Sequence, residues 1–309
     1  MLQFKSKHFL TGEELSQSEL MDLLKMAEFL KKTRGQEKQQ VLNDKTVALI
    51  FEKPSLRTRV SFTVGVQELG GKAIELSSSQ KKNEDPEDEI RVLQGMVHGV
   101  MLRTFSHETL ERMVSKSKIP VINGLSDSHH PCQALADLQT LQQRFGQLKG
   151  LKLAYIGDGN NVLHSLLLLA PFVGVDVHYA CPEAYQPDAE ILERANKRAV
   201  IGGAQIKKFP TPLTAVTGVD AIYTDVWTSM GFEKENEIRM KAFEGYQVNK
   251  NLLSKAQPQA IILHCLPMMK GQEITAEVVE LPNSALFEQA ENRLHAQKAL
   301  MIGLFNGGH

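Results

Sequence analysis

A short segment, Pro54 to Thr58, carries groups that bind anions at the start of a predicted helix. The run before it, 46–51, is apolar and β-branched, which predicts a buried strand. Apolar residues then recur at helical spacing from Val60 until the glycine pair at 70–71. Backbone N–H groups at such a helix start are free, and the helix dipole favours an anion.

The side chains of this segment strengthen the prediction of a phosphate site. Ser55 and Thr58 supply hydroxyl donors, and Arg57 supplies a guanidinium fork that can hold a phosphate through two bonds. The alternative is an N-capped helix with two solvated arginines. Two arginines and two hydroxyls within five residues favour phosphate binding.

Further polar groups follow other predicted strands or open predicted helices. They are Arg103 at the end of strand 99–103, His130 with Gln133 at a helix start, Asp225 near the end of strand 221–226, and Cys265 directly after strand 260–264. Each has a simpler explanation, such as a surface arginine, a helix-capping histidine or a small buried cysteine. Ligands of parallel sheets bind beyond the carboxyl ends of the strands, and so we expect these groups to line a site.

The order of elements predicts an α/β protein. Strands alternate with helices, which indicates doubly wound parallel sheets, and 309 residues suggest two domains. The pattern restarts around 147–150. We also expect a solvated loop from Ser77 to Asp88, with Pro86 inside it, and a final helix from about Ser284 to Leu304.

Composition narrows the class of partner. The net charge of −1 gives no basic excess for nucleic acid or an anionic membrane, which favours small-molecule partners. The N-terminus lacks the features of a secretory signal, and no apolar run is long enough to span a bilayer. The three cysteines, Cys132, Cys181 and Cys265, are too few and too scattered for a disulfide framework, which fits a cytoplasmic protein.

The motifs together resemble those of the ornithine carbamoyltransferases over essentially the whole chain. They are Ser55-Leu56-Arg57-Thr58-Arg59, Met101-Leu102-Arg103-Thr104-Phe105, His130-Pro131-Cys132-Gln133, Gly157-Asp158-Gly159-Asn160-Asn161, Asp225 with Ser229-Met230-Gly231, and His264-Cys265-Leu266-Pro267. Leu56 stands where a threonine is more usual, although its backbone N–H is retained. The segment 79–85 also departs from the family pattern, and its lysines resemble those of aspartate carbamoyltransferases.

The resemblance implies transfer of a carbamoyl group from carbamoyl phosphate to L-ornithine, giving L-citrulline and phosphate, a step of arginine biosynthesis or of a urea-cycle type. It implies that carbamoyl phosphate is bound by Ser55, Leu56, Arg57, Thr58, Gln80 of a neighbouring subunit, Arg103, His130, Gln133, Cys265, Leu266 and Arg293. It implies that ornithine is bound by Asn161, Asp225, Ser229 and Met230, with Cys265, Arg103, His130 and Asp225 catalytic.

The resemblance also implies an architecture and an assembly. The first domain would comprise residues 1–147 with the C-terminal helix, about 285–309, packing back on it, and residues 148–284 would bind ornithine. A homotrimer or a multiple of trimers is expected. No metal or organic cofactor is expected.

The chemistry of the reaction agrees with these roles. Attack on the carbonyl builds negative charge on oxygen, which Arg103, His130 and Thr58 can stabilise. The attacking amine has a pKa of about 10.4 if it resembles lysine, and so it must lose a proton. Asp225 with Cys265 is one route for that proton, and the departing phosphate is another.

Three alternatives remain open. The acceptor could be an N-acylated ornithine, putrescine or aspartate. The chain could be a dinucleotide-binding oxidoreductase, although Gly157-Asp158-Gly159-Asn160-Asn161 lacks the third glycine of that fingerprint. It could also be a non-catalytic protein that kept the fold.

Overall fold

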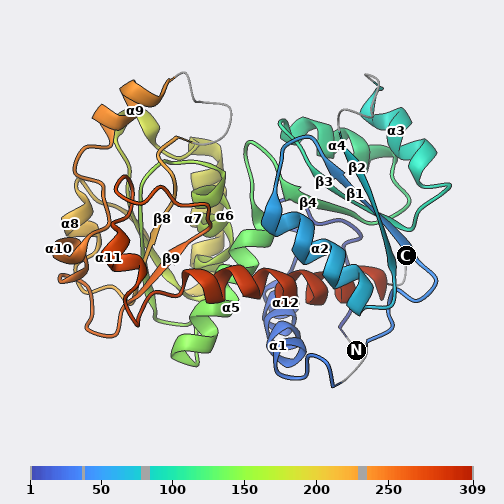
Figure 1. Cartoon of the computed structure of the whole chain (residues 1–309), viewed down its shortest axis with the longest axis horizontal. Helices are drawn as coiled ribbons and strands as arrows, with labels where there is room; N and C mark the ends of the chain where they lie inside the picture. The colour runs from blue at the N-terminus through green and yellow to red at the C-terminus, as the bar shows by residue number, and fades with distance from the viewer. Residues whose placement is uncertain (1, 37–38, 78–83, 229–234, 308–309) are drawn as a thin grey trace. The chain divides into compact units, whose positions relative to one another are not determined.

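The computed structural model describes residues 2–36, 39–77, 84–228 and 235–307. The chain forms two compact units, one made of Met1–Gln139 with Glu291–His309 and one made of Thr140–Ala290. The unit boundaries fall inside helices α5 (Pro131–Phe145) and α12 (Leu286–Phe305). Each unit contains one parallel sheet with helices (Figure 1), and so the predicted α/β fold class is confirmed.

The first unit is built on a four-stranded parallel sheet with the order β2-β1-β3-β4. Its strands are β1 (Thr46–Phe51), β2 (Lys72–Ser77), β3 (Gly99–Arg103) and β4 (Val121–Leu125). β1 and β3 are buried because both lie inside the sheet, and their apolar runs follow from this position. β2 is an edge strand and is largely exposed.

Side chains cap the starts of three helices in the first unit, those that begin at residues 17, 56 and 86. The helices of this unit are α1 (Gln17–Lys32), α2 (Leu56–Glu68), α3 (Pro86–Leu93) and α4 (His107–Lys116), together with parts of α5 and α12. Ser16 and Glu19 form the predicted capping box at the start of α1. Ser55 caps α2, which places the Pro54–Thr58 segment at a helix start as predicted.

One local prediction was wrong. The expected loop from Ser77 to Asp88 ends earlier, because Pro86 is the first residue of α3 and Asp85 is its N-cap. Proline is favoured at this position, since it has a helical φ angle and its missing N–H would be unsatisfied there in any case. The Asp85 side chain accepts a hydrogen bond from the Glu87 N–H, which fixes the start of the helix.

The second unit is built on a five-stranded parallel sheet with the order β7-β6-β5-β8-β9. Its strands are β5 (Lys152–Ile156), β6 (Asp176–Ala180), β7 (Ile206–Lys208), β8 (Ala221–Thr224) and β9 (Ile261–His264). Its helices are α6 (Asn161–Leu169), η2 (Pro171–Val173), η3 (Glu183–Tyr185), α7 (Ala189–Gly202), α8 (Pro212–Ala215), α9 (Asn236–Ala242), α10 (Lys250–Leu253) and α11 (Ala276–Val279). Across the described ranges, no helix combines the length with the apolar character that crossing a bilayer requires.

Each sheet has a point where the strand order reverses. In the first unit β1 lies between β2 and β3, and in the second unit β5 lies between β6 and β8. Crevices form at the carboxyl ends of the strands at such points. In the first unit, the segment Pro54–Thr58 follows β1, and Arg103 is the last residue of β3. In the second unit, Asp158 follows β5 and Asp225 follows β8. The topology therefore assigns the predicted groups to these two edges.

Gly159 is required by a close approach of two chain segments in the second unit. A Cβ atom on this residue would lie 2.3 Å from the backbone nitrogen of Pro187 and 2.6 Å from the carbonyl oxygen of Tyr185. The Gly159 N–H also donates to that carbonyl oxygen at 2.9 Å. The turn after β5 can therefore occupy this position only without a side chain.

We expect Gly159→Ala to lower the free energy of unfolding by about 1–3 kcal/mol, because the added methyl group must displace backbone atoms. Gly95→Ala is the control, since its Cβ would meet only the Val92 carbonyl oxygen at 3.5 Å. Urea unfolding of both variants measures the difference. Equal stability of the two variants would contradict this account of the turn.

Candidate active site

Arg293 on α12 joins three helices in the first unit. Its side chain is buried, with 1% exposed. Its Nη1 donates to Oε1 of Gln133 on α5 at 2.8 Å, and its Nη2 donates to Oγ1 of Thr58 on α2 at 3.1 Å. The structure therefore brings together three residues that the sequence predicted for the phosphate-containing substrate.

A second set of buried residues, which the sequence motifs did not indicate, fixes these side chains. The Gln133 amide donates to Oδ1 of Asp137 at 2.8 Å, which leaves its oxygen for Arg293. Nε of Arg293 donates to Oε1 of Gln297 at 2.7 Å, and the Gln297 amide donates to Ser61 Oγ at 2.9 Å. The signal was the i, i+4 spacing of 133 with 137 and 293 with 297.

His130 lies immediately before α5 and is surrounded by positive charge. Burial lowers the pKa of His130 well below its ordinary value, and Arg293, Arg103 and Arg57 lower it further, in that order. The imidazole is therefore neutral at pH 7. We call Arg57, Arg103, His130 and Arg293 the arginine cluster. Three guanidinium groups near one neutral imidazole make a site for an anion.

The start of α2 differs in one detail from the expectation of free backbone donors. The Thr58 N–H donates to Oγ of Ser55 at 3.3 Å, and so this donor caps the helix. The side chain of Leu56 is 72% exposed, while its backbone remains in the turn. Leucine in place of the more usual threonine at position 56 therefore leaves the buried side chains of the arginine cluster unchanged.

Asp225 is the centre of a second cluster, in the second unit. It is buried, and its Oδ1 accepts hydrogen bonds from Sγ of Cys265 at 2.9 Å and from the Val226 N–H at 2.8 Å. Its Oδ2 accepts from the side-chain amide of Asn160 at 2.8 Å. We call Asp225, Cys265 and Asn160 the aspartate cluster. A buried carboxylate held in this way can pair with an ammonium group.

Asn160 was not predicted, whereas its neighbour Asn161 was. Asn160 is the N-cap of α6, and its Oδ1 accepts from the N–H groups of Val162 and Leu163 at 3.0 and 3.3 Å. The same side chain thus starts a helix and orients Asp225. Asn161 is the first residue of α6 and is half-buried.

A buried ion pair fixes the chain beyond Asp225. Nη1 of Arg239 on α9 donates to Oδ2 of Asp158 at 2.7 Å and to the carbonyl oxygen of Trp227 at 2.9 Å. The Gly-Asp-Gly turn after β5 is thereby tied to the segment that follows β8. The predicted residues Gln80, Ser229 and Met230 lie outside the described residues.

Asp225, His264 and Cys265 offer three potential metal ligands within 4.8 Å of one another. His264, however, uses both ring nitrogens within the protein. Nδ1 accepts from the Leu266 N–H at 2.9 Å, and Nε2 lies 3.0 Å from Oε1 of Glu273. A metal would have to break one of these contacts, and so the donor set does not fit an open metal site.

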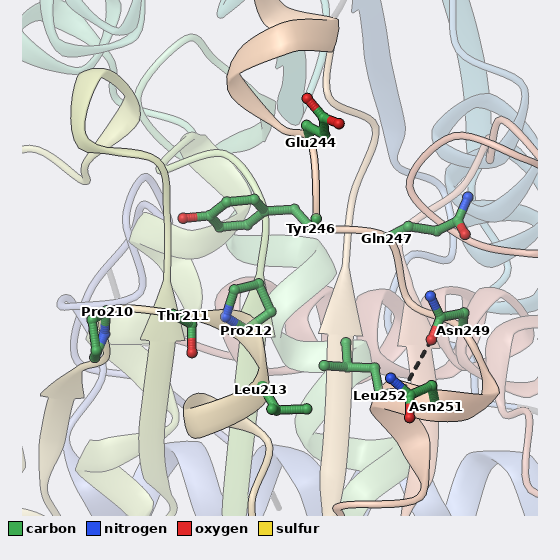
Figure 2. Close-up of a pocket in the computed structure, with 11 residues that line it drawn as sticks. Pro210, Thr211, Pro212, Leu213, Glu244, Tyr246, Gln247, Asn249, Asn251 and Leu252 are labelled. Carbon is green, nitrogen blue, oxygen red and sulfur yellow. Dashed lines mark hydrogen bonds between the residues drawn. The ribbon is translucent and has the colours of Figure 1, made fainter.

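A surface pocket of about 410 Å³ in the second unit contains none of the predicted site residues (Figure 2). It is lined by Pro210, Thr211, Pro212, Leu213, Glu244, Gly245, Tyr246, Gln247, Asn249, Asn251 and Leu252. Glu244 is its only charged residue, and Asn249 is occupied in capping α10 through the Leu252 N–H. The candidate site residues of each unit therefore lie in its own cluster and not in this hollow.

This α/β protein thus has one cluster of polar residues in each unit, with arginines in the first and with a carboxylate and a thiol in the second. The sequence matches the family model of the aspartate/ornithine carbamoyltransferase carbamoyl-P binding domain over residues 7–143. It matches the Asp/Orn binding domain over residues 149–304. The chain belongs to the aspartate/ornithine carbamoyltransferase family.

Individual relatives cover nearly the whole chain. The ornithine carbamoyltransferase of Thermococcus kodakarensis is 46% identical over 299 residues, which are 96% of this chain and 95% of the relative. The structure of ornithine carbamoyltransferase from Pyrococcus furiosus has a TM-score of 0.93 at 42% identity and covers 97% of both chains. A structure of N-acetyl-L-ornithine transcarbamylase has a TM-score of 0.86 at 29% identity, covering 96% of this chain and 99% of that one.

We expect Arg57→Ala to weaken binding of carbamoyl phosphate by about 10- to 100-fold, because hydrogen bonds to a charged group contribute about 1.5–3 kcal/mol. Arg57→Lys should recover little, since lysine lacks the planar fork. Arg59→Ala is the control on the same helix, because Arg59 pairs with Glu75 at 2.9 Å. Titration calorimetry of the three variants measures the effect, and equal losses at 57 and 59 would contradict it.

The lowered pKa of His130 predicts how stability depends on pH. The unfolded chain has a histidine pKa near 6.5 and binds the proton more tightly than the folded chain. This contribution to stability is therefore complete above about pH 6.5 and is lost as the pH falls below it, by at most about 1.4 kcal/mol per pH unit.

His130→Asn removes the titrating group. Urea unfolding at pH 7, 6 and 5 should therefore show a shallower fall in the free energy of unfolding for this variant than for the unmodified chain. The other histidines are common to both proteins and cancel in the comparison. Parallel pH dependence would mean that His130 is not held neutral.

Proposed function

We propose that this protein is an ornithine carbamoyltransferase, which transfers the carbamoyl group of carbamoyl phosphate to the δ-amine of L-ornithine, giving L-citrulline and phosphate. The observation that carries the proposal is the arginine cluster around neutral His130, in the unit that matches a carbamoyl-P binding domain. The names of its relatives and the buried Asp225 support ornithine as the acceptor.

Carbamoyl phosphate is bound through its phosphate by the start of α2. The residues proposed for this contact are Ser55, the Leu56 N–H, Arg57 and Thr58. Arg103, His130 and Gln133 hold the carbamoyl group, with Arg293 and, from a neighbouring subunit, Gln80. The buried contacts of Arg293 with Thr58 and Gln133 support this assignment, because they connect the two groups of residues.

The carbonyl oxygen gains negative charge during attack. Arg103 and Thr58 supply donors for it, and neutral His130 donates an N–H without itself needing to lose a proton. A neutral imidazole also adds no fourth positive charge to the cluster, which keeps release of phosphate possible. His130 is thus a hydrogen-bond donor in this mechanism and not a general base.

Ornithine is bound through its amino-acid end. Asp225 pairs with the charged α-amino group, and Asn161, Ser229 and Met230 bind the rest of that end. Cys265 and the carbonyl group of Leu266 lie beside the attacking amine. The proton of the amine leaves by Asp225 with Cys265 or with the departing phosphate, and the 2.9 Å contact of Sγ with Asp225 supports the first route.

The proposal includes the domain assignment, with residues 1–147 and about 285–309 binding carbamoyl phosphate and 148–284 binding ornithine. It also includes a homotrimer, or a multiple of trimers, in the cytoplasm, acting in arginine biosynthesis. Exposed apolar side chains on α2 and on edge strand β2 support assembly, since Leu56, Val60 and Ile74 are 72%, 51% and 46% exposed.

A different acceptor is the second candidate. The similarity to an N-acetyl-L-ornithine transcarbamylase keeps an N-acylated ornithine under consideration. Its identity of 29% is well below the 46% of the ornithine enzyme, and an acylated α-amine would leave Asp225 without its cationic partner.

We expect ornithine to exceed putrescine and N-acetylornithine by about 10³-fold or more in kcat/KM, because each analogue leaves a buried polar group unpaired. Aspartate has no distal amine and should not react. Lysine should be slow, since its longer chain carries the amine past the carbonyl. Colorimetric detection of the carbamoylated product with each amine and carbamoyl phosphate provides the measurement.

Preference for putrescine, N-acetylornithine or aspartate over ornithine would reject the role of Asp225 while leaving the arginine cluster intact. Absence of product with every amine would reject the transferase proposal itself. Asp225→Asn supplies a further comparison, because it keeps the shape of the side chain and removes its charge. It should reduce the preference for ornithine over putrescine.

A further inference from the structure

A histidine and a glutamate lie buried side by side next to the turn that carries Cys265. His264 is the last residue of β9, and Glu273 follows nine residues later. Neither side chain is exposed to solvent, and Nε2 of His264 lies 3.0 Å from Oε1 of Glu273. Buried ionisable pairs add little to stability. Both residues also form hydrogen bonds with the backbone of the adjacent turn.

The backbone fixes which nitrogen of His264 carries the proton. The Leu266 N–H donates to Nδ1 at 2.9 Å, and so Nδ1 must present a lone pair. The proton of the imidazole is then on Nε2, where Oε1 of Glu273 accepts it. Glu273 thereby selects the tautomer that can hold the Leu266 N–H.

Leu266 needs such support because of its backbone. Its φ angle is +57°, in the left-handed region that a leucine rarely adopts. The two ends of the turn are held as well, since the His264 N–H donates to Oε1 of Gln289 at 2.8 Å and the Met269 N–H donates to Glu273. One glutamate therefore supports the turn both directly and through His264.

We propose that His264 and Glu273 are positioning residues for carbamoyl transfer. Glu273 fixes the proton of His264, His264 holds the peptide between Cys265 and Leu266, and this peptide sets where the thiol and the Leu266 carbonyl lie. The inference rests on the proposed function, which puts those two groups beside the attacking amine. A displacement of about 1 Å there can cost about 10²-fold in rate.

Two substitutions of His264 separate its two contacts. Asparagine carries its amide oxygen on Cγ, as histidine carries Nδ1, and so His264→Asn keeps an acceptor for the Leu266 N–H. His264→Gln reaches towards Glu273 and loses that acceptor. We expect His264→Asn to keep kcat within about 10-fold and His264→Gln to lose about 10²-fold, with KM for carbamoyl phosphate unchanged in both.

Substitutions of Glu273 test whether it acts through the histidine. Glu273→Gln keeps an acceptor of the same shape and should retain kcat, whereas Glu273→Leu should lose about 10²-fold. In the His264→Asn background, where no tautomer has to be selected, Glu273→Leu should cost less than it does alone, and the remaining loss reports its direct contact with Met269. An equal cost in both backgrounds, or a loss in folded Glu273→Gln, would overturn the proposal.

A readout without turnover keeps this test separate from the proposed function. Cys265 is half-buried, while Cys132 and Cys181 are buried, and burial raises the pKa of the Cys132 thiol to about 12. The rate of alkylation by iodoacetamide therefore reports on Cys265. It should change several-fold in His264→Gln and Glu273→Leu and stay near the original rate in His264→Asn.

The matched controls are His178→Asn and His178→Gln. His178 is in the same unit, and its Nδ1 contacts the Ala215 carbonyl oxygen at 3.1 Å on another part of the sheet. Both should leave kcat and alkylation unchanged. If the chain forms no citrulline, the proposed function fails, and the alkylation pattern still decides whether His264 and Glu273 position Cys265. Equal alkylation rates in all four variants at His264 and Glu273 and in the unmodified chain would overturn it.

Discussion

The buried guanidinium of Arg293 is the interaction on which the arrangement of the first unit depends. Burial of a charge is costly unless hydrogen bonds compensate, and Thr58, Gln133 and Gln297 provide acceptors. Helices α2, α5 and α12 are thus joined by hydrogen bonds to one positively charged guanidinium group. The same charge contributes to keeping His130 neutral.

Much of the fold and part of the site followed from the sequence, because both depend on strand ends. Apolar, β-branched runs such as 46–51 specify buried parallel strands, and polar residues directly after them must lie at one edge of the sheet. Arg103 and Asp225 were found in this way. Arg293 was different, since nothing in its own helix distinguishes it, and only the family resemblance indicated it.

The supporting residues were not predicted, because spacing along a helix does not by itself reveal roles that arise from tertiary contacts. Asp137 is an ordinary aspartate in a helix until Gln133 and Arg293 are placed beside it. Asparagine is a common N-cap residue, and so the sequence explains only this role of Asn160. Its second contact is with Asp225, which lies 65 positions away in the chain. Glu273 follows a loop of unremarkable sequence, yet it is fully buried beside His264. The local sequence pattern specifies helices and strands, whereas these contacts form only when the whole unit is folded.

The position of Arg293 in the chain has a consequence for synthesis. Thr58 and Arg293 are separated by 235 positions, and the first unit incorporates the chain from Glu291 onwards. A ribosome-bound chain can therefore form the sheet β2-β1-β3-β4 long before it can complete the arginine cluster. The arginine cluster can be completed only after residue 293 has been synthesised, and so a chain that is still shorter than this lacks one of its four members.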